Sequence, residues 1–243
     1  MRLLTFSRRC AKEILRDPVN LGFGLGFPIV LLLLLTAMQS NIPVDLFAIE
    51  RLAPGISVFG LSFMTLFSAT LVAKDRESSF LQRLYTTPLR PSEFILGYML
   101  PVIPISVGQS VVCYLTALLL GLPVSFNILL AILMTIPISA LFISLGLFVG
   151  SLAGVKAVGG ICGGLFTNLS AWLSGVWFDL ALVGGAFERV ANLLPFVHAV
   201  ELERAIISGN FDGWLGHFAV VIAYAAVSTV CAVLVFLKQM KKQ

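Results

Sequence analysis

The amino-acid composition excludes a water-soluble globular fold. Of the 243 residues, 58% are hydrophobic and only 12% are charged, and the mean hydropathy is +1.01. This leaves too little polar surface to cover a globule of that length, so the chain is predicted to be an integral membrane protein. The net charge of +4 is not gathered into a basic patch, which argues against nucleic acid as a partner.

Six apolar runs have the length of transmembrane helices. A helix needs about 20 apolar residues to cross a bilayer, and the runs cover residues 19–40, 53–73, 95–121, 128–151, 157–178 and 215–237. Residues 1–18 interleave basic and apolar side chains, which predicts a helix lying along the inner membrane surface. With both termini in the cytoplasm, all lysines and arginines except Arg51, Arg189 and Arg204 fall on the cytoplasmic side. We therefore predict an all-α, multi-pass protein with both termini cytoplasmic.

The second predicted span carries an aromatic stripe. Phe59, Phe63 and Phe67 recur at i, i+4 and i+8, so they share one helical face. Apolar residues in a span need no special explanation, and the stripe can simply pack against other helices or face lipid. The alternative is that it forms an apolar wall of a substrate path.

A polar segment, residues 74–94, separates the second and third spans. Ser79 followed by Gln82 is a capping-box pattern, and Pro88 disfavours helix at the residue before it, so a helix of about two turns is expected between them. Four residues fall on one face of this helix: Phe80, Leu81, Leu84 and Tyr85. So short a helix is not stable alone in water. It is therefore expected to lie on a surface, either the bilayer or another protein.

The fifth predicted span begins with small residues. Gly159 is spaced four residues from Gly163, and Gly160 four from Gly164, a spacing that lets two helices approach closely. The contact lies either within one chain or across a dimer. Asn168 is the best candidate for a polar contact near the middle of the membrane. A buried amide there needs a hydrogen-bond partner, which is either another helix or a substrate.

Residues 179–213 are apolar yet contain breaks that exclude a further span. Gly184, Gly185 and Pro195 divide the segment, so two short helices are expected at 186–194 and 198–207, as a partly re-entrant pair at the outer end. Within them, the acidic residues Glu201 and Glu203 with Arg204 are expected to form an intrahelical pair or a gate.

No catalytic set is present in the sequence. His198 and His217 have no nucleophile or second metal ligand beside them, and the four cysteines have neither disulfide nor metal spacing. The phosphate-binding motif G-x-x-x-x-G-K-[ST] is absent. The chain is therefore predicted not to be an enzyme and to bind neither ATP nor a metal itself.

The polar segment also carries a family resemblance. Its order of Arg-Glu, Leu-x-x-Leu, Thr-Pro, Glu and Gly resembles the cytoplasmic loop of permease subunits of ABC-2 type transporters, a class that includes drug and polysaccharide exporters. The residues concerned are Arg76, Glu77, Leu81, Leu84, Thr87, Pro88, Glu93 and Gly97. In that family the loop holds a coupling helix that docks on a separate ATP-binding subunit. The resemblance implies a docking set of Glu77, Phe80, Leu81, Leu84, Tyr85, Thr87 and Pro88.

The resemblance further implies one ABC-2 type transmembrane domain over residues 1–243, in a bacterial cell membrane. Two ATP-binding subunits, which bind ATP and Mg, would join this chain and a second, identical or related permease chain. The complex would export an apolar or amphiphilic drug, peptide or lipid-linked molecule. The implied path residues are Phe59, Phe63, Phe67, Asn168 and Trp172. The competing hypothesis is a membrane anchor or sensory subunit that moves no solute, and a membrane-embedded enzyme is disfavoured by the missing catalytic set.

Overall fold

The computed structural model describes residues 2–43, 47–78 and 91–240, and within these ranges the chain is helical and contains no strand. Among the described residues, five helices are long and apolar enough to cross a membrane. They are α2 (Pro18–Gln39), α3 (Ile49–Glu77), α5 (Pro91–Leu119), α6 (Phe126–Leu152) and α12 (Trp214–Met240). These helices coincide with five of the six predicted spans.

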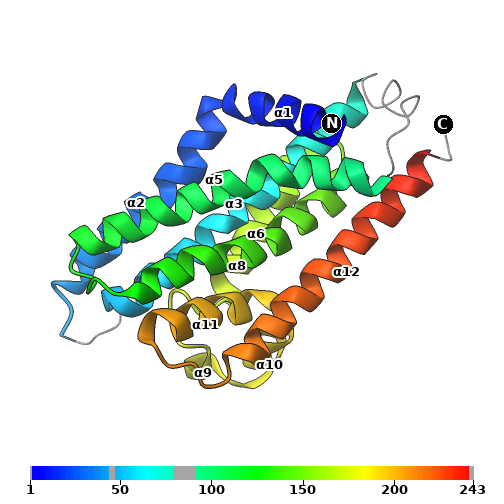
Figure 1. Ribbon diagram of the computed structural model, residues 1–243. Coiled ribbons are helices and arrows are strands. Elements are labelled where there is room, and N and C mark those ends of the chain that lie inside the picture. The colour runs from blue at the N-terminus through cyan, green and yellow to red at the C-terminus, as the bar shows by residue number, and fades with distance from the viewer. Residues whose placement is uncertain (1, 44–46, 79–90, 241–243) are drawn as a thin grey trace.

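Helix α3 occupies the centre of the bundle (Figure 1). Its apolar stretch is 83% buried, against 22% for α2 and 28% for α12. Two glycines of α6 let that helix approach α3 closely: a Cβ at Gly146 would lie 2.2 Å from the carbonyl oxygen of Thr65, and one at Gly150 would lie 2.4 Å from that of Ala69. The crossing of α3 and α6 therefore requires glycine at both positions.

The predicted fifth span is not one regular α-helix. Residues 157–178 fall into α7 (Val155–Val158), the π-helix η1 (Gly159–Phe166) and α8 (Thr167–Leu173), and helix ends there. Four of the eight residues of η1 are glycine, which carries the weakest α-helical preference apart from proline, and this favours a locally wider turn. The backbone stays helical from Val155 to Leu173 without interruption, so a sixth span at this position stays a prediction.

Three helices gather at one end of the bundle: α9 (Leu180–Val183), α10 (Gly185–Leu193) and α11 (Pro195–Ser208) (Figure 1). Helices α10 and α11 confirm the two predicted at 186–194 and 198–207. Proline begins α11, and Gly209 ends it with a φ of +71°, a conformation that favours glycine. Helix α11 packs against α3, α6 and α12. We call this the α11 end of the bundle.

At the opposite end, α1 (Arg2–Leu15) lies across the bundle, and α12 also finishes there (Figure 1). A helix is thus present where the membrane-surface helix is predicted, and it ends at Leu15. Its apolar face is buried, with Phe6 in edge-to-face contact with Phe94 and Tyr98 of α5 at centroid distances of 5.9 and 4.9 Å. We call this the α1 end.

Candidate functional site: a charged junction at the end of helix α3

Helix α3 finishes at the α1 end with four consecutive charged residues, and each is bonded to a different part of the fold. The four are Lys74, Asp75, Arg76 and Glu77. They directly precede the segment in which the sequence predicts a docking helix.

Asp75 joins α3 to both α1 and α5. Both terminal nitrogens of the Arg9 guanidinium donate to its carboxylate, at 2.5 and 2.6 Å, and the Tyr98 hydroxyl donates to Oδ2 at 2.8 Å. Asp75 is only 1% exposed. The two charge-assisted hydrogen bonds from Arg9 compensate the free-energy cost of burying this carboxylate. Arg9 also forms an ion pair with Glu13 at 2.8 Å, so the cation lies between two carboxylates.

The thiol of Cys10, which follows Arg9 on α1, is buried beside the contact between Arg9 and Asp75. Cys10 is fully buried, and this burial, assisted by the negative charge of Asp75, raises the pKa of the thiol to about 12. At neutral pH the thiol is therefore protonated and unreactive.

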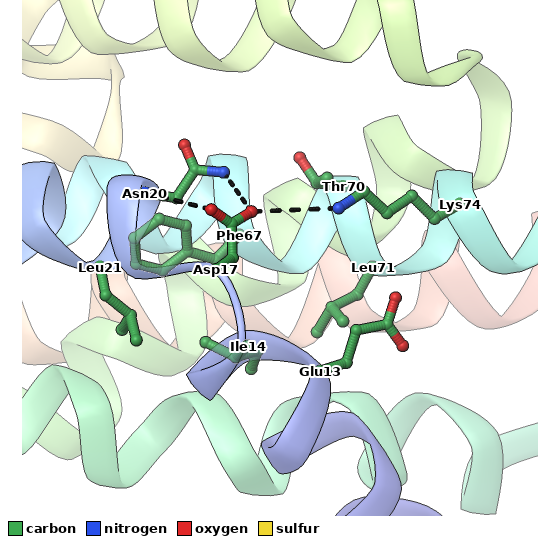
Figure 2. A pocket seen from close by; sticks show the side chains of 9 residues that line it. All are labelled: Glu13, Ile14, Asp17, Asn20, Leu21, Phe67, Thr70, Leu71 and Lys74. Atoms are coloured by element: carbon green, nitrogen blue, oxygen red, sulfur yellow. Dashed lines mark hydrogen bonds and ion pairs between the residues drawn. The ribbon is translucent and has the colours of Figure 1, made fainter.

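Lys74 lies beside the start of α2. Its Nζ is 3.9 Å from Asp17 Oδ2, and Asp17 caps α2 by accepting from the backbone and side-chain nitrogens of Asn20 (Figure 2). The cavity between α1, α2 and α3 measures about 30 Å³, far below the several hundred Å³ of a drug-binding pocket. The junction is therefore a packed contact between helices.

Arg76 bonds to the end of α6, and Glu77 bonds to the start of α7. Arg76 Nη1 donates to the carbonyl oxygens of Gly150 and Ala153 at 2.8 and 3.1 Å, and these acceptors lie at the end of α6. Glu77 Oε1 accepts from the backbone nitrogen of Val155, the first residue of α7, at 2.8 Å. A cation thus lies at a helix C-terminus and an anion at a helix N-terminus, which is the favourable arrangement for both.

The junction contains one of the predicted docking residues, Glu77. The other predicted docking residues, Phe80, Leu81, Leu84, Tyr85, Thr87 and Pro88, lie outside the described residues, so the docking helix stays a prediction.

The aromatic stripe of α3 packs inside this chain. Phe59 and Phe67 are 4% and 6% exposed, and Phe63 contacts Phe27 of α2 with a centroid distance of 5.7 Å. Phe59 is also in edge-to-face contact with Trp177, at 5.6 Å. In this conformation the stripe is a packing surface, and its role in a substrate path stays a prediction.

Two further predicted path residues lie on the surface of α8. The Asn168 amide donates to Gly164 O of its own helical segment at 2.8 Å, and the side chain is exposed. Trp172 is 56% exposed and lies 5.9 Å from the ring of Phe178. Asn168 is therefore bonded to its own helix, and both residues can face lipid or another chain.

The four glycines of η1 divide between two environments. A Cβ at Gly163 would lie 3.5 Å from Leu66 of α3, an ordinary contact. The other three have nothing within 4 Å of the position of a Cβ: Gly159, Gly160 and Gly164. Contact within the chain thus accounts for Gly163 alone, and packing of the others on a second chain stays a prediction.

Two polar contacts at the α11 end were missed by the sequence reasoning. His198 of α11 and His217 of α12 place their Nδ1 atoms 2.8 Å apart, and His198 Nε2 lies 2.9 Å from the carbonyl oxygen of Asn192. Since that carbonyl only accepts, His198 carries its proton on Nε2, and in the neutral pair His217 Nδ1 donates. Within the described ranges no group of three His, Cys, Asp or Glu side chains gathers as metal ligands would.

The second missed contact concerns the acidic residues of α11. Glu201 pairs with Arg204 at 2.8 Å, as the sequence suggested, and Arg204 also donates to the carbonyl oxygens of Gly175 and Arg51. Glu203 takes no part in this pair and is fully buried among α5 and α6. Its position on the apolar face of α11, between Ala199, Val200 and Ile206, was a signal available in the sequence.

Comparison with known proteins assigns this architecture to a family. The family model described as ABC-2 type transporter matches residues 1–208, which is the chain from α1 to the end of α11. The chain is also similar to ABC transporter G family member 20 of Dictyostelium discoideum, with 31% identity over 164 residues. That match covers 65% of this chain and 22% of the longer relative.

Proposed function

The chain belongs to the ABC-2 type transporter family, as the membrane component of an ABC transporter, and we propose that it is the permease subunit of an ATP-driven exporter. The proposed cargo is apolar or amphiphilic, such as a drug, a peptide or a lipid-linked molecule. The family pairs with an ATP-binding subunit, and the sequence lacks the phosphate-binding motif of an ATPase. ATP and Mg would therefore be bound by the partner.

The observation that carries the proposal is the junction at Lys74 to Glu77. It lies directly before the segment proposed to dock on the ATPase, and its contacts reach α1, α2, α5, α6 and α7. A displacement of the docking segment would therefore be transmitted to all five elements together. ATP binding can drive such a change only if it favours one arrangement of these helices over the other.

The proposed pathway forms between two permease chains. Three open glycines, Gly159, Gly160 and Gly164, offer a face on which a second helix can pack closely. Two ATP-binding subunits would join the two permease chains, which are identical or closely related. The packed state of Phe59 and Phe67 corresponds to a closed path, and movement of α3 away from α2 would expose their rings.

The burial of that stripe also favours a second candidate function. If Phe59 and Phe67 never leave their packing, the chain is a membrane anchor or sensor for an ATPase complex and moves no solute. Both candidate functions require an ATP-binding partner subunit, but only the exporter moves solute across the membrane.

The first experiment is purification of the tagged chain from its native membrane in mild detergent, with mass spectrometry of what accompanies it. We expect a stoichiometric partner that carries a phosphate-binding motif. Recovery of the chain without such a partner, under conditions that preserve other complexes, would contradict both candidates. Proteoliposomes of the complex then decide between them, since only an exporter accumulates an amphiphilic dye when ATP is added.

A further inference from the structure

Glu203 is a carboxyl group buried completely at the α11 end. It is 0% exposed, and its side chain enters the space between α5 and α6. The Tyr114 hydroxyl of α5 donates to Oε2, and the Thr135 hydroxyl of α6 lies 3.4 Å from Oε1. Among the described residues, no lysine, arginine or histidine forms a hydrogen bond or ion pair with this carboxyl.

The hydroxyl groups around Glu203 extend into a buried network. Thr135 Oγ1 bonds Ser110 Oγ at 2.8 Å, and Ser110 Oγ lies 3.1 Å from Ser57 Oγ of α3. These three side chains are also 0% exposed. Hydroxyls can donate or accept, so the network can satisfy the carboxyl in either protonation state. It connects α11 with α3, α5 and α6.

The other charged and titratable groups of the neighbouring elements have different partners. On α11 itself, Arg204 bonds Glu201 and the carbonyl oxygens of Arg51 and Gly175. On α5, Tyr114 bonds Glu203, and the nearby Cys113 accepts from Gln109 Nε2; the phenol and the thiol are both neutral when protonated.

Helices α3 and α6 offer only hydroxyls to the network, Ser57 and Thr135. From α12, His217 bonds His198, which is five residues before Glu203 and so about 140° away around α11.

A buried carboxylate without a countercharge is unfavourable, and such a group retains its proton instead. Burial raises the pKa of Glu203 to about 8, and the hydrogen bonds from Tyr114 and Thr135 oppose this rise. At neutral pH the carboxyl is therefore mainly protonated. In the neutral form it fits the apolar surroundings of α11.

We propose that Glu203 is a proton-binding site whose neutral form holds helix α11 against α5 and α6, and that loss of this proton loosens α11 from the bundle. Ionisation would place a charge with no cationic partner inside the contact, and exposure of the carboxylate to water would relieve it. The proposal makes the α11 end sensitive to alkaline pH. It does not depend on export, because the proton is bound by the chain itself.

The direct test is difference infrared spectroscopy of the purified full chain, which observes the carbonyl band of a protonated carboxylic acid. Between about pH 6 and about pH 10, wild-type protein should lose one such band with a midpoint near pH 8. Glu203→Gln should lack this change, and Glu201→Gln, altered on the same helix, should retain it. A wild-type chain without the band, or a band that survives in Glu203→Gln, would overturn the proposal.

Tyr114→Phe provides a second variant that keeps the carboxyl. It removes a donor that stabilises the carboxylate, so the infrared midpoint should move to higher pH. This result does not require Glu203→Gln to fold. A midpoint that stays in place or moves to lower pH would contradict the assignment.

Discussion

Arg9 and Asp75, which lie 66 residues apart in the chain, share two hydrogen bonds of 2.5 and 2.6 Å. Arg9 belongs to α1 and Asp75 to α3, the central helix of the bundle. Because α3 ends two residues after Asp75, the pair fixes α1 to the bundle beside the segment proposed to receive the ATPase. Through the Arg9–Asp75 pair, α1 is part of the charged junction at the end of α3.

Asp75→Asn should destabilise the folded chain. The change leaves Arg9 without the buried carboxylate, and breaking a buried pair costs about 3 to 5 kcal/mol. Since the Arg9 side chain is 36% exposed, we expect a smaller loss, about 2 kcal/mol, in the free energy of unfolding. Chemical unfolding in detergent measures this loss. The matched control is Glu13→Gln, which removes the more exposed partner of Arg9 and should cost less than about 1 kcal/mol. Equal effects of the two changes would contradict the role given to Asp75.

The close crossing of α3 and α6 predicts that Gly150→Ala is harmful. The added methyl group would lie 2.4 Å from a backbone oxygen of α3, which cannot move without shifting the helix. We expect a loss of about 1 to 3 kcal/mol, typical of an overpacked core, in the same unfolding measurement. Gly26→Ala on α2 is the control, because nothing lies within 4 Å of its Cβ position. A stable Gly150→Ala protein would show that the two helices are not in this close contact.

Cys10 should be almost inert toward thiol reagents. With a pKa of about 12, its thiolate fraction at neutral pH is about a thousandfold below that of an ordinary thiol, and burial blocks access further. Maleimide labelling followed by mass spectrometry should leave Cys10 unmodified. Leu15→Cys, on the exposed face of the same helix, should be labelled rapidly. Fast labelling of Cys10 in the folded chain would mean that α1 detaches from the bundle.

The pKa of Glu203 also predicts how stability depends on pH. The group binds its proton more tightly in the folded chain than in the unfolded one, where the pKa is near 4.5. Its contribution to stability is therefore complete below about pH 4.5 and is lost as the pH rises through about 8. The thermal unfolding temperature of wild-type protein should fall across this range. Glu203→Gln should show a smaller fall, and an equal fall in both proteins would contradict the prediction.

The sequence predicted the features that depend on local pattern. Runs of about 20 apolar residues located α2, α3, α5, α6 and α12, and glycine and proline located α10 and α11. The wider π-helical turns at η1 were missed because apolar length was counted without regard to four glycines in eight residues. The partners of Lys74 to Glu77 come from five other elements, so no spacing along the chain could identify them. Glu203 was grouped with Arg204 by proximity in sequence, whereas the helical period places it on another face.

Glu77 gives the last prediction, which concerns coupling. Its carboxylate accepts from the first amide of α7 while the side chain is otherwise exposed, so Glu77→Gln should leave the fold intact. The variant loses a charge-assisted contact beside the proposed docking segment, and both ATP-driven transport and transport-coupled ATPase activity should fall. Glu188→Gln on α10, at the other end of the bundle, controls for the loss of one surface carboxylate. If Glu77→Gln transported normally in proteoliposomes, the junction would be a structural contact that plays no part in coupling.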